Sequence, residues 1–321
     1  MMSTKLLIIH QGALGDMVLT FPAIIALRNK FDRVDLLCQG QIGKLAVQLE
    51  LIDEAYPLES ANFATLYSNQ AAPEVKNLIS KYARFLVFSF SPDLEKAINR
   101  ITDRPCLRIP SRPPVQERIH VAEFLLQNLR RGGLIEQTGV NNLVSEWQKE
   151  QARRMDRLPH RSKVVIHPGS GSVRKRWPLG RFIALAKVLD NKGCRPHFVC
   201  GPAESDLIGE IQSHNQKVRH FSELTDLVRW FKTAGGYVGN DSGASHLAAF
   251  LGLPSVVVFG PADPMRWKPP GPRVKVVHPA MDCHPCFEIE PENCDEPECL
   301  ADASLEIVIE AFDDVVQSGQ I

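Results

Sequence analysis

The stretch from Gly236 to Gly260 constrains the fold more than any other part of the sequence. Two apolar segments, ending at Val238 and spanning residues 255–259, flank a polar turn at 240–243 and a short apolar helix pattern that ends before Gly252. Strand, turn, helix and strand in this order form one parallel crossover. The chain is therefore predicted to contain a parallel sheet with helices packed beside it.

The turn in this stretch places polar groups where an anion can bind. Ligands of open parallel sheets bind beyond the carboxyl ends of the strands, and a helix that begins there offers unpaired N–H groups and a positive dipole end. Asp241, Ser242 and Gly243 occupy that point, and His246 follows about one helical turn after Ser242. The structural alternative is that Asp241 and Ser242 merely cap the helix and that His246 is half-exposed. The stretch alone does not separate the two interpretations.

Length and charge narrow the class of protein. A chain of 321 residues exceeds what one hydrophobic core readily supports, so two domains are expected. Lys plus Arg and Asp plus Glu both total 37, and this zero net charge argues against nucleic-acid binding, which needs clustered cations. No apolar run approaches the roughly 20 residues of a membrane span, and Leu6–Ile9 is too short for a signal peptide. A cytoplasmic protein is expected.

The first half opens with a strand at Lys5–His10, a glycine turn and a helix pattern at Met17–Lys30. Gly12 and Gly15 allow the backbone to approach a ligand closely. Asp16 falls in the first helical turn, where the helix dipole stabilises a carboxylate. It is either a residue of a ligand cleft or only a helix-capping acid. Further strands alternate with helices downstream, so this half is predicted to be α/β.

The second half repeats this opening theme. A change in composition between Gly139 and Ser162 indicates a linker, and the predicted domains are residues 1–158 and 159–321. A strand at 164–167, a turn of small residues and a helix at 179–191 follow the linker. The sequence therefore predicts two Rossmann-like domains whose parallel sheets face each other across a cleft.

Three polar residues of the second half suit phosphate and ribose groups. Ser170 offers a hydroxyl donor within the small-residue turn, and Lys175 adds a mobile charge suited to a pyrophosphate. Glu204 follows a strand and suits ribose hydroxyls, although a role as a negative charge at a helix N-terminus explains it nearly as well. The sequence contains no Asp-x-Asp motif, so no metal-bridged diphosphate is expected. A helix N-terminus, Lys175 and a protonated His246 could hold the diphosphate charge instead.

Four cysteines form a compact group near the end of the chain: Cys283, Cys286, Cys294 and Cys299. Four thiols this close could hold a tetrahedral zinc ion, which reducing cytosol favours over disulfides. Their spacing matches no standard zinc ribbon or finger. Structural metal and four unligated or redox-labile thiols therefore stay open as alternatives. No catalytic metal and no other cofactor is predicted.

Three separated motifs resemble the family 9 glycosyltransferases, which are the ADP-heptose:lipopolysaccharide heptosyltransferases and their relatives. The motifs are Gly12-Ala-Leu-Gly-Asp16 with Pro22, His167-Pro-Gly-Ser170 with Lys175-Arg-Trp177-Pro178, and Asn240-Asp-Ser-Gly-Ala-Ser-His246 followed by Gly252-Leu-Pro254. They lie in both halves and in the order of the family. Gly171 stands where some heptosyltransferases have a hydroxyl, and some members lack the cysteine group. These departures leave the donor sugar open.

The resemblance implies a GT-B fold in which the first domain binds the acceptor, the second binds the nucleotide sugar, and transfer inverts the anomeric centre. The roles it implies on this chain are a general base at Asp16, diphosphate contacts at Ser170 and Lys175, a ribose contact at Glu204, an adenine edge at residues 222–224, and contacts to the sugar and its phosphate at Asp241, Ser242, Gly243 and His246. Because a pyrophosphate would repel Asp241, that carboxylate fits sugar hydroxyls or the helix cap better. The implied partners are ADP-heptose and a lipopolysaccharide or glycolipid acceptor, reached by peripheral contact with the inner membrane.

The leading prediction is thus an inverting, metal-independent glycosyltransferase that moves a heptose or related sugar onto a lipopolysaccharide core or related envelope glycan. Two alternatives share the two-domain cleft. A GT-B nucleotide-sugar epimerase would isomerise its donor without any acceptor. A non-catalytic nucleotide-sugar-binding module would bind the donor and yield no product.

Overall fold

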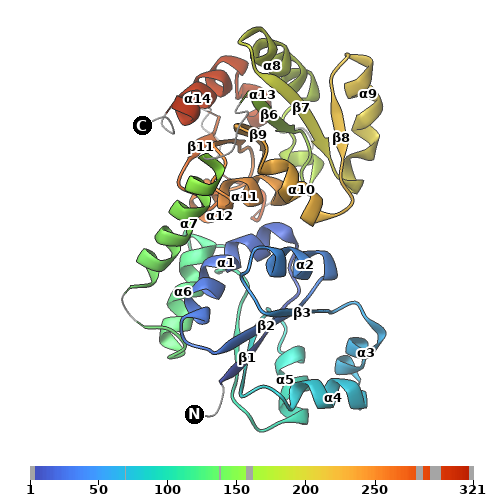
Figure 1. Cartoon of the computed structure of the whole chain (residues 1–321), viewed down its shortest axis with the longest axis vertical. Coiled ribbons are helices and arrows are strands. Elements are labelled where there is room, and N and C mark those ends of the chain that lie inside the picture. Colours follow the sequence, from blue (N-terminus) through green and yellow to red (C-terminus); the bar gives the residue numbers. More distant parts are fainter. Residues whose placement is uncertain are drawn as a thin grey trace. The chain divides into compact units, whose positions relative to one another are not determined.

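The computed structural model describes residues 4–68, 70–136, 139–156, 162–279, 285–289 and 298–317. The chain divides into two compact units, Met1–Val144 and Ser145–Ile321, and each is built around its own parallel sheet (Figure 1). No helix in the described ranges has the length and apolar character needed to cross a membrane.

The sheet of the first unit has the strand order β3-β2-β1-β4-β5, and all of its neighbouring strands are parallel. Its strands are β1 (Lys5–His10), β2 (Arg33–Cys38), β3 (Glu54–Pro57), β4 (Arg84–Phe88) and β5 (Cys106–Ile109). The chain leaves β1 toward β2 and β3 and later returns to pair β4 on the opposite side. The carboxyl end of β1 is therefore a topological switch point, where ligands of such sheets bind.

Helices cover both faces of this first sheet. They are α1 (Leu14–Arg28), α2 (Gly40–Gln48), α3 (Ala61–Ala64), α4 (Pro73–Ile79), α5 (Asp93–Ile101) and α6 (Val121–Arg131), with a 3-10 turn η1 (Thr65–Tyr67) after α3. Successive β1 residues point to opposite faces, and Leu7 and Ile9 pack with the apolar side chains of α4 and α5. Helix α1 packs against α6. Because both faces are covered, β1 is an almost continuous apolar run.

The second sheet has the order β11-β10-β9-β6-β7-β8 and is also parallel throughout. Its strands are β6 (Lys163–His167), β7 (Arg195–Cys200), β8 (Val218–His220), β9 (Gly236–Asn240), β10 (Ser255–Val258) and β11 (Val274–Val277). The chain runs outward from β6 through β7 to β8 and then returns to β9. The order reverses between β6 and β9, so the switch point lies at the carboxyl ends of these two strands.

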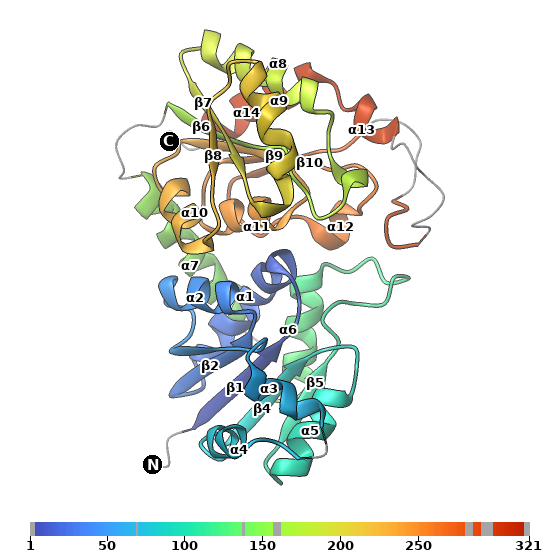
Figure 2. The ribbon, with the colours of Figure 1, turned by 90° about the vertical axis from the view of Figure 1, so that its right-hand side faces the viewer.

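The helices of the second unit include α7, which begins in the first unit. They are α7 (Val140–Asp156), α8 (Leu179–Asn191), α9 (Ile208–Ser213), α10 (Leu224–Phe231), α11 (Gly243–Phe250), α12 (Pro264–Trp267), α13 (Glu298–Asp302) and α14 (Leu305–Gln317), with 3-10 segments η2 (Val173–Lys175) and η3 (Pro202–Leu207). Helices α8 and α14 cover one face of the sheet and α10 and α11 the other (Figure 2).

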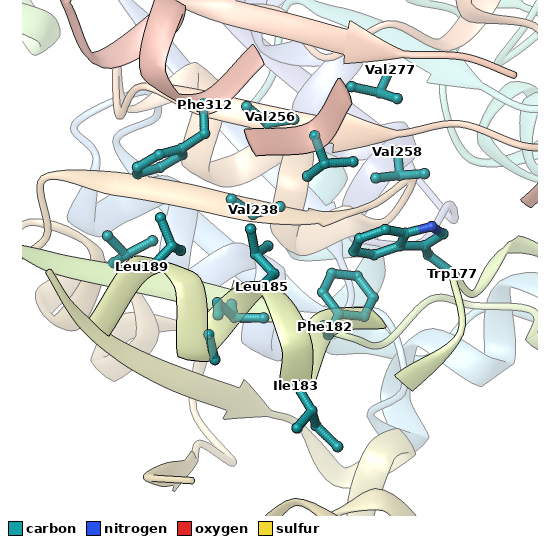
Figure 3. Packing of buried hydrophobic residues seen from close by; sticks show 14 of the residues in the cluster. Trp177, Phe182, Ile183, Leu185, Leu189, Val238, Val256, Val258, Val277 and Phe312 are labelled. Carbon is teal, nitrogen blue, oxygen red and sulfur yellow. The ribbon is translucent and has the colours of Figure 1, made fainter. Parts of the chain in front are cut away.

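The main core of this unit lies under α8 and α14. Trp177 and Phe182 meet edge to face, with ring centroids 4.9 Å apart and an interplanar angle of 86°. Val238 and Val256 of the central strands and Phe312 of α14 complete the packing (Figure 3). The indole N–H of Trp177 donates to Ala303 O (2.9 Å), so this large ring is buried without an unsatisfied donor. The loop that carries Lys175 is thereby anchored to the core.

The division between the two units falls at 144/145, inside α7, whereas the sequence placed it at 158/159. Helix α7 is charged and was interpreted as a linker, but one face of it packs on the second unit. Trp147 stacks on Phe250 of α11, with ring centroids 4.2 Å apart. Gly252, with a φ of +84°, approaches Ala152 so closely that an added Cβ would lie 2.7 Å from its Cα. The charged composition of α7 reflects its exposed face, and it gives no indication that the opposite face packs on the second unit.

Candidate functional site

The opening of α11 lies at the switch point of the second sheet. Strand β9 ends at Asn240, and Ser242 adopts an extended conformation before α11 begins at Gly243. The Ser242 hydroxyl accepts from Ser245 N (3.3 Å), so Ser242 is the N-cap, as the structural interpretation held. Asp241, Ser242 and His246 are buried, which gives the opening a low dielectric. Capping and anion binding are compatible here, because one side chain satisfies only one of the N–H groups at a helix start.

Asp241 brings two predicted site residues together. Lys175 Nζ donates to its Oδ2 (2.9 Å), and His246 Nε2 lies 3.5 Å from its Oδ1. Burial by itself raises the pKa of Asp241, but the hydrogen bond from His246 and the positive charge of Lys175 outweigh it, and the pKa lies below its usual range. Asp241 is therefore a buried carboxylate at neutral pH, and it fixes the position of the lysine.

Two further contacts tie the small-residue turn to the same point. The hydroxyl of Ser170 donates to the carbonyl oxygen of Asp241 (2.7 Å). The side chain of Asn240 donates from Nδ2 to Pro168 O (2.8 Å) and accepts at Oδ1 from Trp177 N (2.8 Å). Sequence reasoning placed Asn240 only in the turn and gave it no role. Its place directly after an apolar strand is the signal that could have identified it.

Glu204 lies against this turn. Its Oε2 accepts from Gly201 N (2.8 Å), so the carboxylate caps the start of η3. A Cβ on Gly169 would lie 2.3 Å from Glu204 Cδ, which means that only glycine leaves room for the carboxylate. His167 lies nearby and is neutral, because burial lowers its pKa more than the charge of Glu204 raises it. Its Nδ1 donates to Val199 O (2.9 Å).

The structure adds a residue that sequence reasoning missed. The ring of Phe287 lies 4.8 Å from Lys175 Nζ, so the ammonium group contacts both this ring and the Asp241 carboxylate. Phe287 N donates to Pro261 O (2.9 Å). The next residue, Glu288, accepts from Trp267 Nε1 (2.8 Å) and Arg266 Nε (2.9 Å). No local pattern indicates this contact, because Lys175 and Phe287 are distant in sequence.

On the expectation that Lys175 contacts the diphosphate of ADP, replacing Phe287 with leucine should weaken ADP binding about two- to fivefold, because a cation–π contact contributes roughly 0.5–1 kcal/mol and restrains Lys175. Calorimetric titration with ADP measures the effect. Ile289→Ala on the same segment is the control, since Ile289 is 58% exposed and its removal should leave affinity unchanged. Equal affinities for the Phe287→Leu variant and the native protein would contradict the role given to the ring.

The cysteine group is only partly described. Cys283 and Cys294 lie outside the described residues, so the zinc prediction stays a prediction. Cys286 Sγ lies 3.9 Å from Arg174 Nη2, and Cys299 is buried in α13. Within the ranges that the structure describes, no three metal-ligating side chains cluster.

In the first unit, Asp16 lies in the first turn of α1, just beyond the carboxyl end of β1. Its carboxylate forms no hydrogen bond or ion pair with another residue of the described ranges, and it is only partly buried. The N-cap residue Ala13 provides no side-chain cap. Among the described residues, Asp16 therefore has no side-chain partner, and it lies at a topological switch point, where ligands of such sheets bind.

Two doubly wound parallel-sheet units, with a lysine, carboxylate and histidine at a helix opening in the second, fit the GT-B fold. Residues 110–295 match the model of glycosyltransferase family 9 (heptosyltransferase). The chain belongs to this family. The predicted fold class, the family resemblance and the assignment as a glycosyltransferase are thus confirmed.

Individual relatives agree with this assignment. Lipopolysaccharide heptosyltransferase 3 of Escherichia coli (strain K12) is 21% identical over 299 residues, which cover 79% of this chain and 82% of that protein. A family 9 glycosyltransferase from Veillonella parvula has a similar structure, with a TM-score of 0.75 at 18% identity over 98% of both chains. The E. coli heptosyltransferase WaaC, solved with ADP, has a TM-score of 0.68 at 16% identity, with 97% of this chain and 100% of that one covered.

The structure thus gathers the seven predicted donor-side residues in one region of the second unit. They are Ser170, Lys175, Glu204, Asp241, Ser242, Gly243 and His246. The segment predicted to border adenine follows β8, where Phe221 N donates to Cys200 O (3.1 Å). Asp16 belongs to the first unit.

Proposed function

We propose that the protein transfers a heptose from ADP-heptose to a lipopolysaccharide core or a related envelope glycan, with inversion and without a metal ion. The observation that carries the proposal is the buried contact of Lys175 and His246 with Asp241 at the opening of α11. A structure of WaaC holds ADP-2-deoxy-2-fluoro heptose, and several relatives are lipopolysaccharide heptosyltransferases, which supports the choice of donor.

On the donor side, the proposed task is to stabilise the charge that develops on ADP as it leaves. Lys175 brings a positive charge, and the N–H groups at the start of α11 bring the positive end of a helix dipole. Both are positioned before the donor binds, because Asp241 holds the lysine and Ser242 caps the helix. In our proposal, Asp241 and His246 contact the sugar, Ser170 and Lys175 contact the diphosphate, and Glu204 contacts the ribose.

On the acceptor side, we propose that Asp16 is the general base. It takes the proton of the acceptor hydroxyl as that oxygen attacks the anomeric carbon, and the bond to the ADP oxygen breaks. Attack from the face opposite the leaving group inverts the configuration. The carboxylate is free for this step, since no described side chain binds it.

The proposal is tested with lipopolysaccharide from a heptose-deficient strain as acceptor, presented in vesicles. Mass spectrometry is expected to show one added heptose when ADP-heptose is the donor, and the same yield in EDTA. ADP should raise the melting temperature more than UDP does, because bound ligand stabilises the folded state by mass action. Co-flotation of the protein with the vesicles tests the peripheral membrane contact that we also propose.

Several outcomes would decide against this proposal. Absence of heptose transfer, with transfer from another nucleotide sugar, would reassign the donor. Isomerised donor in the absence of acceptor would favour an epimerase; a UDP-GlcNAc 2-epimerase from Methanocaldococcus jannaschii has the same fold, with a TM-score of 0.52 at 11% identity. Protein that stays below the vesicles while transfer proceeds would contradict the membrane contact alone.

A further inference from the structure

The last residue of β1, His10, uses both ring nitrogens within the turn that leads to Asp16. It is fully buried. Gly12 N donates to His10 Nδ1 (3.0 Å), and His10 Nε2 lies 3.2 Å from Thr20 Oγ1. The Thr20 hydroxyl in turn donates to Asp16 O (2.9 Å). Strand β1, the glycine turn and the first two turns of α1 are therefore joined by one chain of hydrogen bonds.

The directions of these hydrogen bonds determine the state of the ring. Nδ1 accepts a hydrogen bond, so it carries no proton. The only hydroxyl proton of Thr20 goes to Asp16 O, so Nε2 must carry a proton and donate it to Thr20 Oγ1. His10 is therefore the neutral Nε2–H tautomer. Burial also lowers the pKa of His10 to about 4, which keeps the ring neutral at physiological pH.

The packing around the turn leaves it little freedom. A Cβ at position 12 would lie 2.5 Å from His10 Cε1 and 2.7 Å from Asp16 Cβ. Gly12 therefore lies between the histidine ring and the Asp16 side chain. Because Ala13 offers no capping side chain, the ring provides the acceptor that holds the turn before α1.

We propose that His10 is a positioning residue for Asp16, an inference that rests on the proposed function of Asp16 as base. His10 fixes the turn and the start of α1 relative to β1, and so fixes where the carboxylate lies. It is not a proton relay, because its nitrogens bind Gly12 N and the Thr20 hydroxyl and neither binds the Asp16 carboxylate. His10 acts by fixing the position of Asp16, so its loss should lower kcat and leave donor binding unchanged.

The test compares His10→Phe, which keeps an aromatic ring and removes both nitrogens, with Thr20→Val, which keeps the shape and removes the hydroxyl. His10→Phe is expected to lower kcat about 10- to 100-fold, the scale of a misplacement of about 1 Å, and to leave KM for ADP-heptose unchanged. Thr20→Val should have a smaller effect. The double variant should resemble His10→Phe, because both changes break one network.

His120→Phe is the matched control. His120 Nδ1 also accepts a backbone N–H in the first unit, from Ala122 (3.3 Å), but at the start of α6. This variant should keep the native kcat. An equal loss of kcat in both histidine variants would overturn the proposal, and so would a His10→Phe variant whose defect lies in the KM for ADP-heptose.

A second measurement stands even if a variant folds poorly or the native protein transfers no sugar. Nitrogen-15 NMR of the native ring should show the Nε2–H tautomer at neutral pH, and His10→Phe should speed hydrogen exchange at the Gly12 amide. A Nδ1–H or doubly protonated ring would overturn the proposal. If the native protein shows this tautomer and a protected Gly12 amide but has no transferase activity, the proposed function is refuted. The conclusion that His10 holds the turn before α1 then still stands.

Discussion

Replacing Asp16 with asparagine is expected to lower kcat about 10²- to 10⁴-fold, which is the contribution typical of a general base. The amide has the same shape and cannot take the proton of the acceptor hydroxyl. Since the Asp16 side chain has no partner in the described structure, its replacement breaks no contact there. The affinity for ADP, measured by calorimetry, should stay at the native value, because the proposed donor residues lie in the other unit.

Asp93→Asn is the matched control for this experiment. Asp93 also lies in the first turn of a helix of the same unit, α5, where it accepts from Ser91 Oγ (2.6 Å). Its replacement should cost about 0.3–1 kcal/mol of stability through the helix dipole and leave kcat unchanged. Native turnover by the Asp16→Asn variant would falsify the assignment of the base. A large loss in the Asp93→Asn variant would mean that charge at a helix start, and no specific base, governs the rate.

The parts of the fold that local patterns determine could be predicted from the sequence. Apolar runs such as Leu6–Ile9 and residues 255–259 indicated buried strands, because strands covered on both faces lack alternation. Short glycine-containing turns after β1 and β9 indicated that a helix begins directly after each of these strands. Since the carboxyl ends of parallel strands meet at one edge of a sheet, residues in such turns could be grouped before the structure was known. Hence Ser170, Lys175 and Asp241 were found together.

Other features depend on contacts between distant parts of the chain, and local patterns carry no signal of them. Phe287 lies beside Lys175, and the neighbouring Glu288 is held by Arg266 and Trp267, but no periodicity links these segments. The boundary inside α7 depends on the stacking of Trp147 on Phe250. A charged composition could equally describe a solvated linker helix or, as here, a helix with one packed face.

The same limit applies to hydrogen bonds that determine a chemical state. The sequence places His10 at the end of an apolar strand, where a histidine commonly serves only as a core residue. Its neutral tautomer follows from the position of the Thr20 hydroxyl and from the direction of one backbone N–H. Such an inference needs atomic positions and cannot come from residue types and spacing.

Lys175→Met is expected to destabilise the protein on the order of 3 kcal/mol, because it leaves the buried carboxylate of Asp241 without its lysine. The same variant should bind ADP about 10- to 100-fold more weakly, since a charge-assisted hydrogen bond contributes about 1.5–3 kcal/mol. Urea denaturation measures the first effect and calorimetry the second. The contacts of Ser170 with the Asp241 carbonyl oxygen and of His246 with the Asp241 carboxylate remain in this variant, so the start of α11 should keep its conformation.

The double variant Lys175→Met with Asp241→Asn separates the two effects. Removing both charges should recover most of the lost stability, because no unpaired charge stays buried, whereas ADP affinity should stay low. Additive losses of stability in the double variant would show that the ion pair between Nζ and Oδ2 is not what couples these residues. Full recovery of ADP affinity would show that Lys175 serves Asp241 alone and not the diphosphate.

The lowered pKa of Asp241 predicts how the free energy of unfolding varies with pH. Its pKa is lower in the folded protein than the value near 4 of an unfolded chain. The unfolded state therefore binds this proton first as the pH falls. The stabilisation is fully present above about pH 4 and is lost as the pH drops through the folded value. Between pH 5 and pH 3 the Asp241→Asn variant should lose less stability than the native protein in urea titrations, and parallel losses would mean that Asp241 is not held charged by Lys175 and His246.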